Sequence, residues 1–160
     1  MIMSKQKQII FIFSLSFFLG IIRSFFLDDP NFSIIKKERK LKEINTFKIP
    51  TDMTEPMIVS LEFAKYHHDN SSAIFIDARD PEEYESGHIK NAINIPYDNY
   101  EEYEGEIDKL DETAIYITYC NGEECSLSLD LADYLYNEKL FDNVLIFEGG
   151  WPEWNESGYP

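Results

Sequence analysis

The stretch AIYITYCNGEECSLSLDLADYLYNEKL (residues 114–140) decides the fold class of this chain. Its first six residues form a continuous apolar run rich in β-branched and aromatic side chains, which is typical of a buried parallel strand. After Ser126, apolar side chains recur on one face at helical spacing: Leu127, Leu131, Tyr134 and Leu135. A strand that leads through a short loop into a helix is the repeating unit of an α/β protein.

The same alternation of strand and helix extends to both sides of this stretch. MIVS (57–60) predicts a short strand that ends at Ser60, a helix cap, and LEFAKYHHD (61–69) predicts the helix that follows. Three further runs predict strands: AIFIDA (73–78), NAINIP (91–96) and NVLIF (143–147). We therefore expect an α/β layer fold with a mainly parallel sheet.

The loop CNGEEC holds both cysteines of the chain, and it lies where such a fold places reactive groups. Cys120 directly follows the buried strand, and the next helix is expected to begin at about Cys125 or Ser126. A tight loop at this point presents backbone amides and the positive end of a helix dipole, which favour a thiolate. Gly122 allows the loop to curl because it tolerates positive φ. Cys120 is therefore a candidate nucleophile.

Three stretches in the same order and spacing resemble a known family, the rhodanese-like domains. They are FIDARDPEEYESGHIKNAINIP (75–96), YCNGEECS (119–126) and NVLIFEGGWPEWNESGYP (143–160). The resemblance covers about Met57 to Pro160 and implies a three-layer fold whose central sheet is flanked by helices. An N-terminal hydrophobic helix followed by one such domain with a Cys-x4-Cys loop is also similar to a membrane-tethered bacterial subset of the family.

The resemblance implies sulfur transfer. Cys120 would be the catalytic residue, taking a sulfane sulfur from a donor, holding it as a persulfide and passing it to a thiol acceptor. Asp77 and Arg79 match the Asp-x-Arg of the family and would support the site by holding its loops. No metal or organic cofactor is implied. The persulfide cradle would be the active-site loop that follows Cys120, formed by Asn121, Gly122, Glu123, Glu124, Cys125 and Ser126.

The loop departs from relatives that carry a basic residue near its end. Glu123 and Glu124 make it acidic, and Cys125 occupies roughly the basic position. At about 7 Å, one carboxylate opposes a thiolate by about 0.6 kcal/mol in water and about 2.4 kcal/mol at an effective dielectric of 20. We therefore expect poor use of thiosulfate, and a neutral or protein-bound persulfide as donor.

Cys125 has two interpretations: it forms a disulfide with Cys120 and resolves it, or it packs as a small side chain at the helix start. We favour packing. A zinc site lacks a second pair of ligands, and Ser126 stands where a cysteine phosphatase needs arginine. Two functions from other classes remain alternatives: a catalytically silent rhodanese-like binding module, and a thiol-disulfide redox protein that uses both cysteines.

The charge is distributed unevenly along the chain. Residues 57–160 contain 24 acidic and five basic side chains, whereas residues 1–56 contain six acidic and nine basic ones. An acidic domain repels a phosphate backbone, so we expect no nucleic-acid partner.

Residues 1–27 predict a membrane anchor or signal segment. Lys5 and Lys7 precede an uncharged apolar run from Ile9 to Ile22. We expect an uncleaved anchor in a bacterial inner membrane, with the domain outside the cytoplasm. Residues 28–56 are expected to be a linker with a short helix around Lys36–Ile44, and residues 57–160 the rhodanese-like domain.

Overall fold

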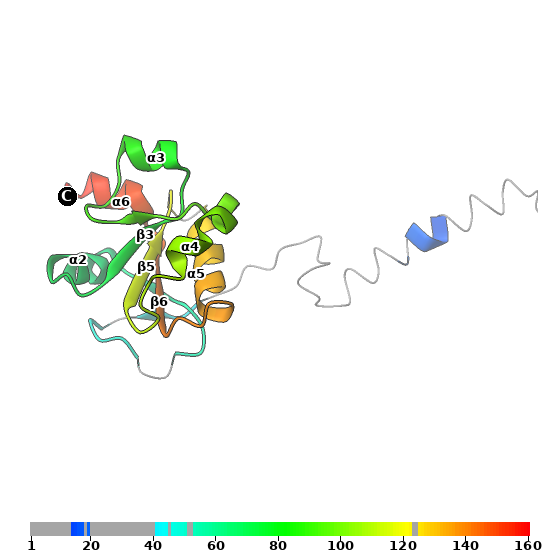
Figure 1. Ribbon diagram of the computed structural model, residues 1–160, viewed down its shortest axis with the longest axis horizontal. Helices are drawn as coiled ribbons and strands as arrows, with labels where there is room; N and C mark the ends of the chain where they lie inside the picture. Colours follow the sequence, from blue (N-terminus) through cyan, green and yellow to red (C-terminus); the bar gives the residue numbers. More distant parts are fainter. Residues whose placement is uncertain (1–13, 18, 20–40, 45, 51–52, 123–124) are drawn as a thin grey trace, which may run out of the picture. The chain divides into compact units, whose positions relative to one another are not determined.

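The computed structural model describes residues 14–17, 19, 41–44, 46–50, 53–122 and 125–160 (Figure 1). The chain divides into two compact units, residues 1–40 and 41–160. In the first unit the described residues, 14–17 and 19, are helical. The second unit contains the sheet and all the sites discussed below.

The second unit is built on a six-stranded sheet in the order β1-β2-β6-β5-β3-β4, and every neighbouring pair is parallel. This confirms the predicted α/β fold with a parallel sheet. The strands are β1 (Glu43–Ile44), β2 (Met57–Val59), β3 (Ile74–Asp77), β4 (Ile93–Asn94), β5 (Ile115–Tyr119) and β6 (Asn143–Phe147).

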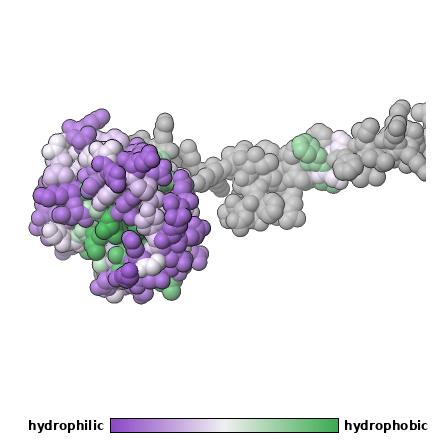
Figure 2. Space-filling model, turned by 45° about the horizontal axis from the view of Figure 1, so that its top comes forward, coloured by the Kyte–Doolittle hydropathy of each residue, from purple (hydrophilic) through white to green (hydrophobic). Residues whose placement is uncertain are grey.

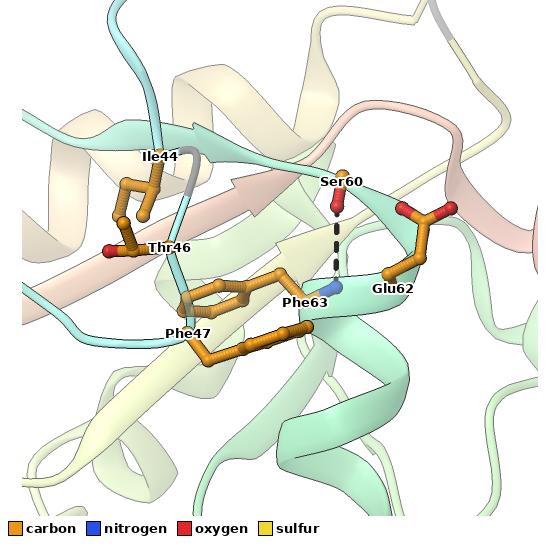
Figure 3. A pocket seen from close by; sticks show the side chains of 6 residues that line it. All are labelled: Ile44, Thr46, Phe47, Ser60, Glu62 and Phe63. Carbon is orange, nitrogen blue, oxygen red and sulfur yellow. Dashed lines mark hydrogen bonds between the residues drawn. The ribbon is translucent and has the colours of Figure 1, made fainter.

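Most of the helices connect successive strands along the chain, as parallel pairing requires, and the last helix follows β6. Ser60 caps the first of them, α2, by accepting a hydrogen bond from the Phe63 amide, as its sequence predicts (Figure 3). The helical segments are α2 (Leu61–Asp69), α3 (Pro81–Ser86), the 3-10 helix η1 (Tyr97–Tyr103), α4 (Glu104–Ile107), α5 (Leu127–Asn137) and α6 (Gly150–Glu156).

Both faces of the sheet are covered, which makes the fold three-layered. Along β5 the side chains alternate: Ile117 and Tyr119 enter one hydrophobic cluster, whereas Tyr116 and Cys120 enter the other. The first cluster also holds Trp154 of α6, together with residues of α2. The second holds buried residues of α4 and α5: Ile107, Leu131, Ala132 and Leu135. Continuous apolar runs in the sequence therefore correspond to strands buried on both sides.

The structure differs from the sequence-based expectation between residues 28 and 56. The prediction of a short helix around Lys36–Ile44 was wrong for its last residues, because Glu43–Ile44 is strand β1. Residues 36–40 lie outside the described part of the chain. The Ile58 amide donates to the Lys42 carbonyl oxygen, and Ile44 is buried in the core. Pairing with β2 therefore decides the conformation of this short segment.

Phe47, which follows β1, contacts helix α2. Its ring stacks on Phe63 at 6.5 Å between centroids and lies beside Tyr66 at 4.8 Å. The rings of Phe47 and Phe63 border a small pocket between β1 and the start of α2, which is also lined by Ile44, Thr46, Ser60 and Glu62 (Figure 3). The chain before Met57 thus completes the folded unit, which begins at Leu41.

The membrane anchor predicted for residues 1–27 lies mostly outside the described residues. Among the residues that the structure describes, no helix has both the length and the apolar character needed to cross a membrane.

The face of the folded unit shown in Figure 2 is mostly hydrophilic, with one hydrophobic patch in its middle. This agrees with the acidic composition of residues 57–160.

His67 is a buried histidine on α2 that ties two segments together. Its Nε2–H donates to the Phe47 carbonyl oxygen at 3.3 Å, and its Nδ1 accepts from the Ser72 hydroxyl at 2.8 Å. Burial disfavours the imidazolium, so the pKa of His67 is lowered even though the Phe47 carbonyl favours the charged form.

Acidification should therefore destabilise the fold through His67. This contribution is complete above the ordinary histidine pKa of 6.5 and declines as the pH falls toward the lower folded-state pKa. The slope is at most about 1.4 kcal/mol per pH unit, because one proton is involved. Urea unfolding across this pH range measures it, with His67→Gln as control. We expect a flatter pH profile for the variant, and identical profiles would contradict the prediction.

Candidate active site

The carboxyl ends of three adjacent strands meet at one edge of the sheet. Asp77 at the end of β3 is in register with Tyr119 at the end of β5, and Tyr119 is in register with Phe147 at the end of β6. The loops that follow these strands are therefore neighbours, as is usual for sites in parallel sheets. Cys120 is the first residue beyond β5, and its loop lies between the other two.

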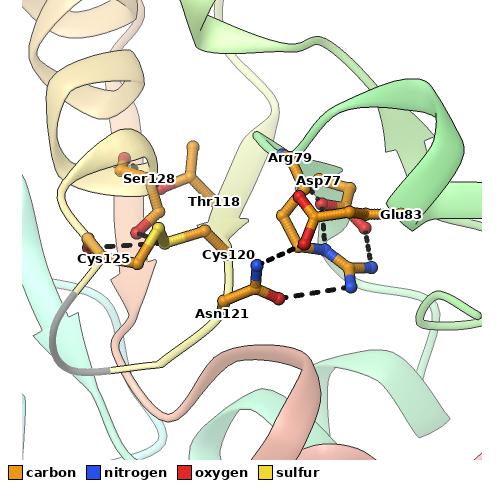
Figure 4. The surroundings of a disulfide bond; sticks show 8 residues. All are labelled: Asp77, Arg79, Glu83, Thr118, Cys120, Asn121, Cys125 and Ser128. Atoms are coloured by element: carbon orange, nitrogen blue, oxygen red, sulfur yellow. Dashed lines mark hydrogen bonds and ion pairs between the residues drawn. A yellow bond between two sulfur atoms is a disulfide. The ribbon is translucent and has the colours of Figure 1, made fainter.

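Cys120 and Cys125 are joined by a disulfide, with their Cα atoms 6.4 Å apart (Figure 4). The preference for simple packing of Cys125 was therefore wrong, although Cys125 also packs against the hydrophobic cluster beneath it. Cys120 is only 1% exposed, whereas Cys125 is partly exposed. In this state the sulfur of Cys120 is bonded and covered.

Ser128 of α5, which is not among the predicted site residues, lies beside the covered sulfur. Its hydroxyl is 3.3 Å from the Sγ of Cys120. The Thr118 hydroxyl, at 2.9 Å, donates to the Ser128 carbonyl oxygen and so fixes the first turn of α5 on strand β5. All three side chains are buried. The helical register signals this contact, since Ser128 lies on the same side of α5 as the buried Leu131 and Leu135.

The backbone of the loop closes on itself. The Cys125 amide donates to the Gly122 carbonyl oxygen at 2.9 Å, and Gly122 has a φ of 98°, which glycine adopts without strain. The Cys125 amide, predicted to belong to a persulfide cradle, is thus occupied within the loop. Glu123 and Glu124 lie outside the described residues, and Ser126 precedes α5.

Asp77 and Arg79 form a buried ion pair next to the loop. The Arg79 guanidinium donates from Nε to Asp77 Oδ1 at 2.9 Å and from Nη2 to Oδ2 at 2.6 Å, a bidentate geometry. Both side chains are at most 3% exposed. Burial is the largest single influence and works against the charge of Arg79. The hydrogen bonds and the negative charge of Asp77, with smaller contributions from Tyr119 and Glu83, together outweigh it, and the pKa of Arg79 is raised. Arg79 therefore stays charged, with its charge matched by Asp77.

The guanidinium also connects the loops around it (Figure 4). Its Nη2 donates to the Gly87 carbonyl oxygen at 2.8 Å, and its Nη1 donates to the Asn121 side-chain oxygen at 3.4 Å. The Asn121 amide in turn donates to Glu83 of α3 at 2.6 Å. Arg79 and Asn121 thus link the segment after α3 to the residue that follows Cys120. The sequence indicated Asp77 and Arg79 as supports, but it gave no sign of the contact with Glu83.

The third loop, after β6, supports the backbone of Cys120. The Trp151 amide donates to the Cys120 carbonyl oxygen at 2.9 Å. Gly150, with a φ of 61°, brings its backbone so close that an added Cβ would clash with that same carbonyl and lie 2.7 Å from the Gly122 nitrogen. Gly150, the second of the paired glycines, thus allows two backbones to pack against each other.

Gly150→Ala should destabilise the domain by clash as well as by backbone strain. Gly158→Ala is a matched control, because Gly158 also has positive φ (71°) but nothing lies within 4 Å of an added Cβ. We expect the control to lose about 1 kcal/mol from left-handed strain alone, and Gly150→Ala to lose at least about 2 kcal/mol more. Urea unfolding measures both. Equal losses would show that the contact with the Cys120 loop is unimportant.

The fold and site define a class: parallel α/β domains with a cysteine in the loop that connects a central strand to a helix. The family model of the rhodanese-like domain matches residues 60–157. The chain therefore belongs to the rhodanese-like domain family.

Curated relatives match the same part of the chain. A tRNA uridine(34) hydroxylase from Erwinia tasmaniensis is 31% identical over 58% of this chain, and one from Salmonella arizonae is 34% identical over the same share. The matched region is 27% of each relative. The chain thus spans about a quarter of the length of the curated relatives it matches.

Solved structures share the fold. A protein from Bacillus halodurans has a TM-score of 0.55 and 24% identity, over 66% of this chain and 74% of that one. The polysulfide-sulfur transferase homodimer of Wolinella succinogenes has a TM-score of 0.51 and 25% identity, over 66% of this chain and 77% of that one.

Proposed function

We propose that this protein is a sulfurtransferase that carries a sulfane sulfur on Cys120. The observation that carries the proposal is the position of Cys120: it directly follows the central strand β5 of a rhodanese-like domain, in a loop held by neighbours on both sides. The similarity to a polysulfide-sulfur transferase adds support, because that protein is named for the same class of reaction.

The reaction needs only the thiol and its surroundings. In the reduced protein, the Cys120 thiolate attacks the outer sulfur of a donor persulfide, R–S–SH. The S–S bond of the donor breaks, R–S⁻ leaves and takes up a proton, and Cys120 holds the persulfide. An acceptor thiolate then attacks that outer sulfur, and the Cys120 thiolate is released. No net oxidation or reduction occurs.

The charges around the loop favour a neutral or protein-bound donor over thiosulfate. The nearest buried cation, Arg79, has its charge matched by Asp77, and the carboxylate of Glu83 accepts a hydrogen bond from Asn121. Glu123 and Glu124 add two acids to the loop itself. A dianion such as thiosulfate meets repulsion here, since like charges at close range cost free energy.

The test of sulfur uptake compares two single-cysteine proteins. After reduction, Cys125→Ser retains Cys120, and Cys120→Ser is the matched control that retains Cys125. With glutathione persulfide, we expect intact mass spectrometry to show one added sulfur atom on Cys125→Ser and none on Cys120→Ser. With thiosulfate, uptake should be at least about tenfold slower, equivalent to about 1.4 kcal/mol in the barrier. Equal uptake by both variants would contradict a specific role for Cys120.

The disulfide favours a second candidate, a thiol-disulfide redox protein that uses Cys120 and Cys125. Such a protein would exchange its disulfide with other dithiols and would not take up sulfur from any donor. Failure of Cys125→Ser to gain sulfur, with rapid disulfide exchange in the unsubstituted protein, would favour this candidate. Absence of both reactions would favour a silent binding module.

We also propose that residues 1–27 anchor the protein in a bacterial inner membrane, as the apolar run behind Lys5 and Lys7 indicates. The full chain should then remain in the membrane fraction after an alkaline wash, and a variant without residues 1–27 should be released. Release of both would contradict the anchor.

A further inference from the structure

We propose that Cys125 resolves the persulfide on Cys120, so that the protein reduces a sulfane sulfur to sulfide and closes its own disulfide. The inference rests on the proposed function, because it requires a persulfide on Cys120. It adds a second reaction, the release of sulfide, and a second reactant, an external dithiol that reopens the loop.

Cys125 lies within bonding reach of Cys120. The two sulfur atoms are bonded in this structure, so the loop brings Cys125 onto Cys120 while strand β5 and helix α5 keep their hydrogen bonds. The turn that achieves this is local, since the Cys125 amide donates to the Gly122 carbonyl oxygen at 2.9 Å. Cys125 thus competes with any outside acceptor as an intramolecular nucleophile. Such nucleophiles have the advantage of high effective concentration.

Cys125 meets the sulfur that would be the inner one of a Cys120 persulfide. In the disulfide its Sγ is bonded to the Sγ of Cys120, which is the inner sulfur of a Cys120 persulfide. Attack there forms the Cys120–Cys125 bond and breaks the bond to the outer sulfur, which leaves as HS⁻ and takes up a proton. The protein loses two thiol hydrogens, and the sulfane sulfur gains two electrons. Attack on the outer sulfur would only move the persulfide to Cys125.

The two cysteines differ in their exposure to solvent. With the disulfide closed, Cys120 is 1% exposed, so a donor cannot approach its sulfur. Cys125 is partly exposed and is the sulfur that an external dithiol can attack. The group released by that attack is the Cys120 thiolate, beside the Ser128 hydroxyl at 3.3 Å, which can donate a hydrogen bond to it. The two cysteines therefore have different roles, with Cys120 as carrier and Cys125 as resolving residue.

The complete cycle balances with a dithiol as reductant. Donor persulfide and dithiol are consumed, and donor thiol, hydrogen sulfide and the disulfide of the reductant are formed. The acidic loop favours release of the outer sulfur as sulfide over its storage on Cys120. A persulfide is an anion at neutral pH, and Glu123 and Glu124, close to Cys120 in the sequence, repel it.

The experiment is a single turnover with the full chain. The protein is reduced, freed of reductant, and mixed with one equivalent of glutathione persulfide. We expect about one sulfide released per chain, loss of both loop thiols, and a Cys120–Cys125 disulfide by peptide mapping. In Cys125→Ser the sulfur should remain on Cys120, with sulfide release at least tenfold lower. Added thioredoxin-type dithiol should reduce the Cys120–Cys125 disulfide of the unsubstituted protein and so allow repeated turnover. In Cys125→Ser no such disulfide forms, and the dithiol can act only as an acceptor of the outer sulfur.

The outcomes separate this inference from the function on which it rests. If both proteins gain and retain one sulfur on Cys120, the sulfurtransferase stands and the resolving role of Cys125 is overturned. A persulfide found on Cys125 of the unsubstituted protein would overturn it as well, because it shows attack on the outer sulfur. If Cys125→Ser gains no sulfur, the proposed function fails, and this inference fails with it.

Discussion

The buried pairing of Asp77 with Arg79 is the interaction on which the rest of the site depends. Taking two charges out of water is expensive, and their attraction offsets this only when the geometry is good and the remaining polar groups are satisfied. Here both carboxylate oxygens accept from the guanidinium, and the guanidinium also reaches Gly87 and Asn121. Through these bonds the pair holds the end of β3, the segment at Gly87 and the loop at Asn121 together. The loop that follows Cys120 is positioned through the contact of Asn121 with Arg79.

The sequence predicts those parts of the fold that depend on local patterns. Continuous apolar runs identify β3, β5 and β6 because both of their faces are buried, and Ser60 marks the start of α2 because its side chain caps the first turn. Strand β1 was missed because its two residues carry no period, and its pairing with β2 depends on residues distant in the sequence.

The candidate site also contains residues that local patterns indicate and contacts that only the folded chain creates. Cys120, Asp77 and Arg79 are recognisable because they lie in stretches that resemble a family. The disulfide is not recognisable from the sequence. Two cysteines five positions apart can either bond to each other or pack separately, and the turn at Gly122 decides between these outcomes. The contact of Asn121 with Glu83 joins residues 38 positions apart, which come together only when the sheet is assembled. Ser128 is an intermediate case. Helical spacing predicts that it lies on the buried side of α5, but not that its hydroxyl contacts the Sγ of Cys120.

Strand β1 gives the fold a mechanical property. It is one of the two edge strands of the sheet, it pairs with β2 through two residues, and it is the first strand of the unit that follows residues 1–40. Tension applied through the N-terminal segment would therefore act first on Glu43 and Ile44 and peel them from β2. The force would reach the four central strands, with the cysteine loop at their carboxyl ends, only after β1 had detached from β2.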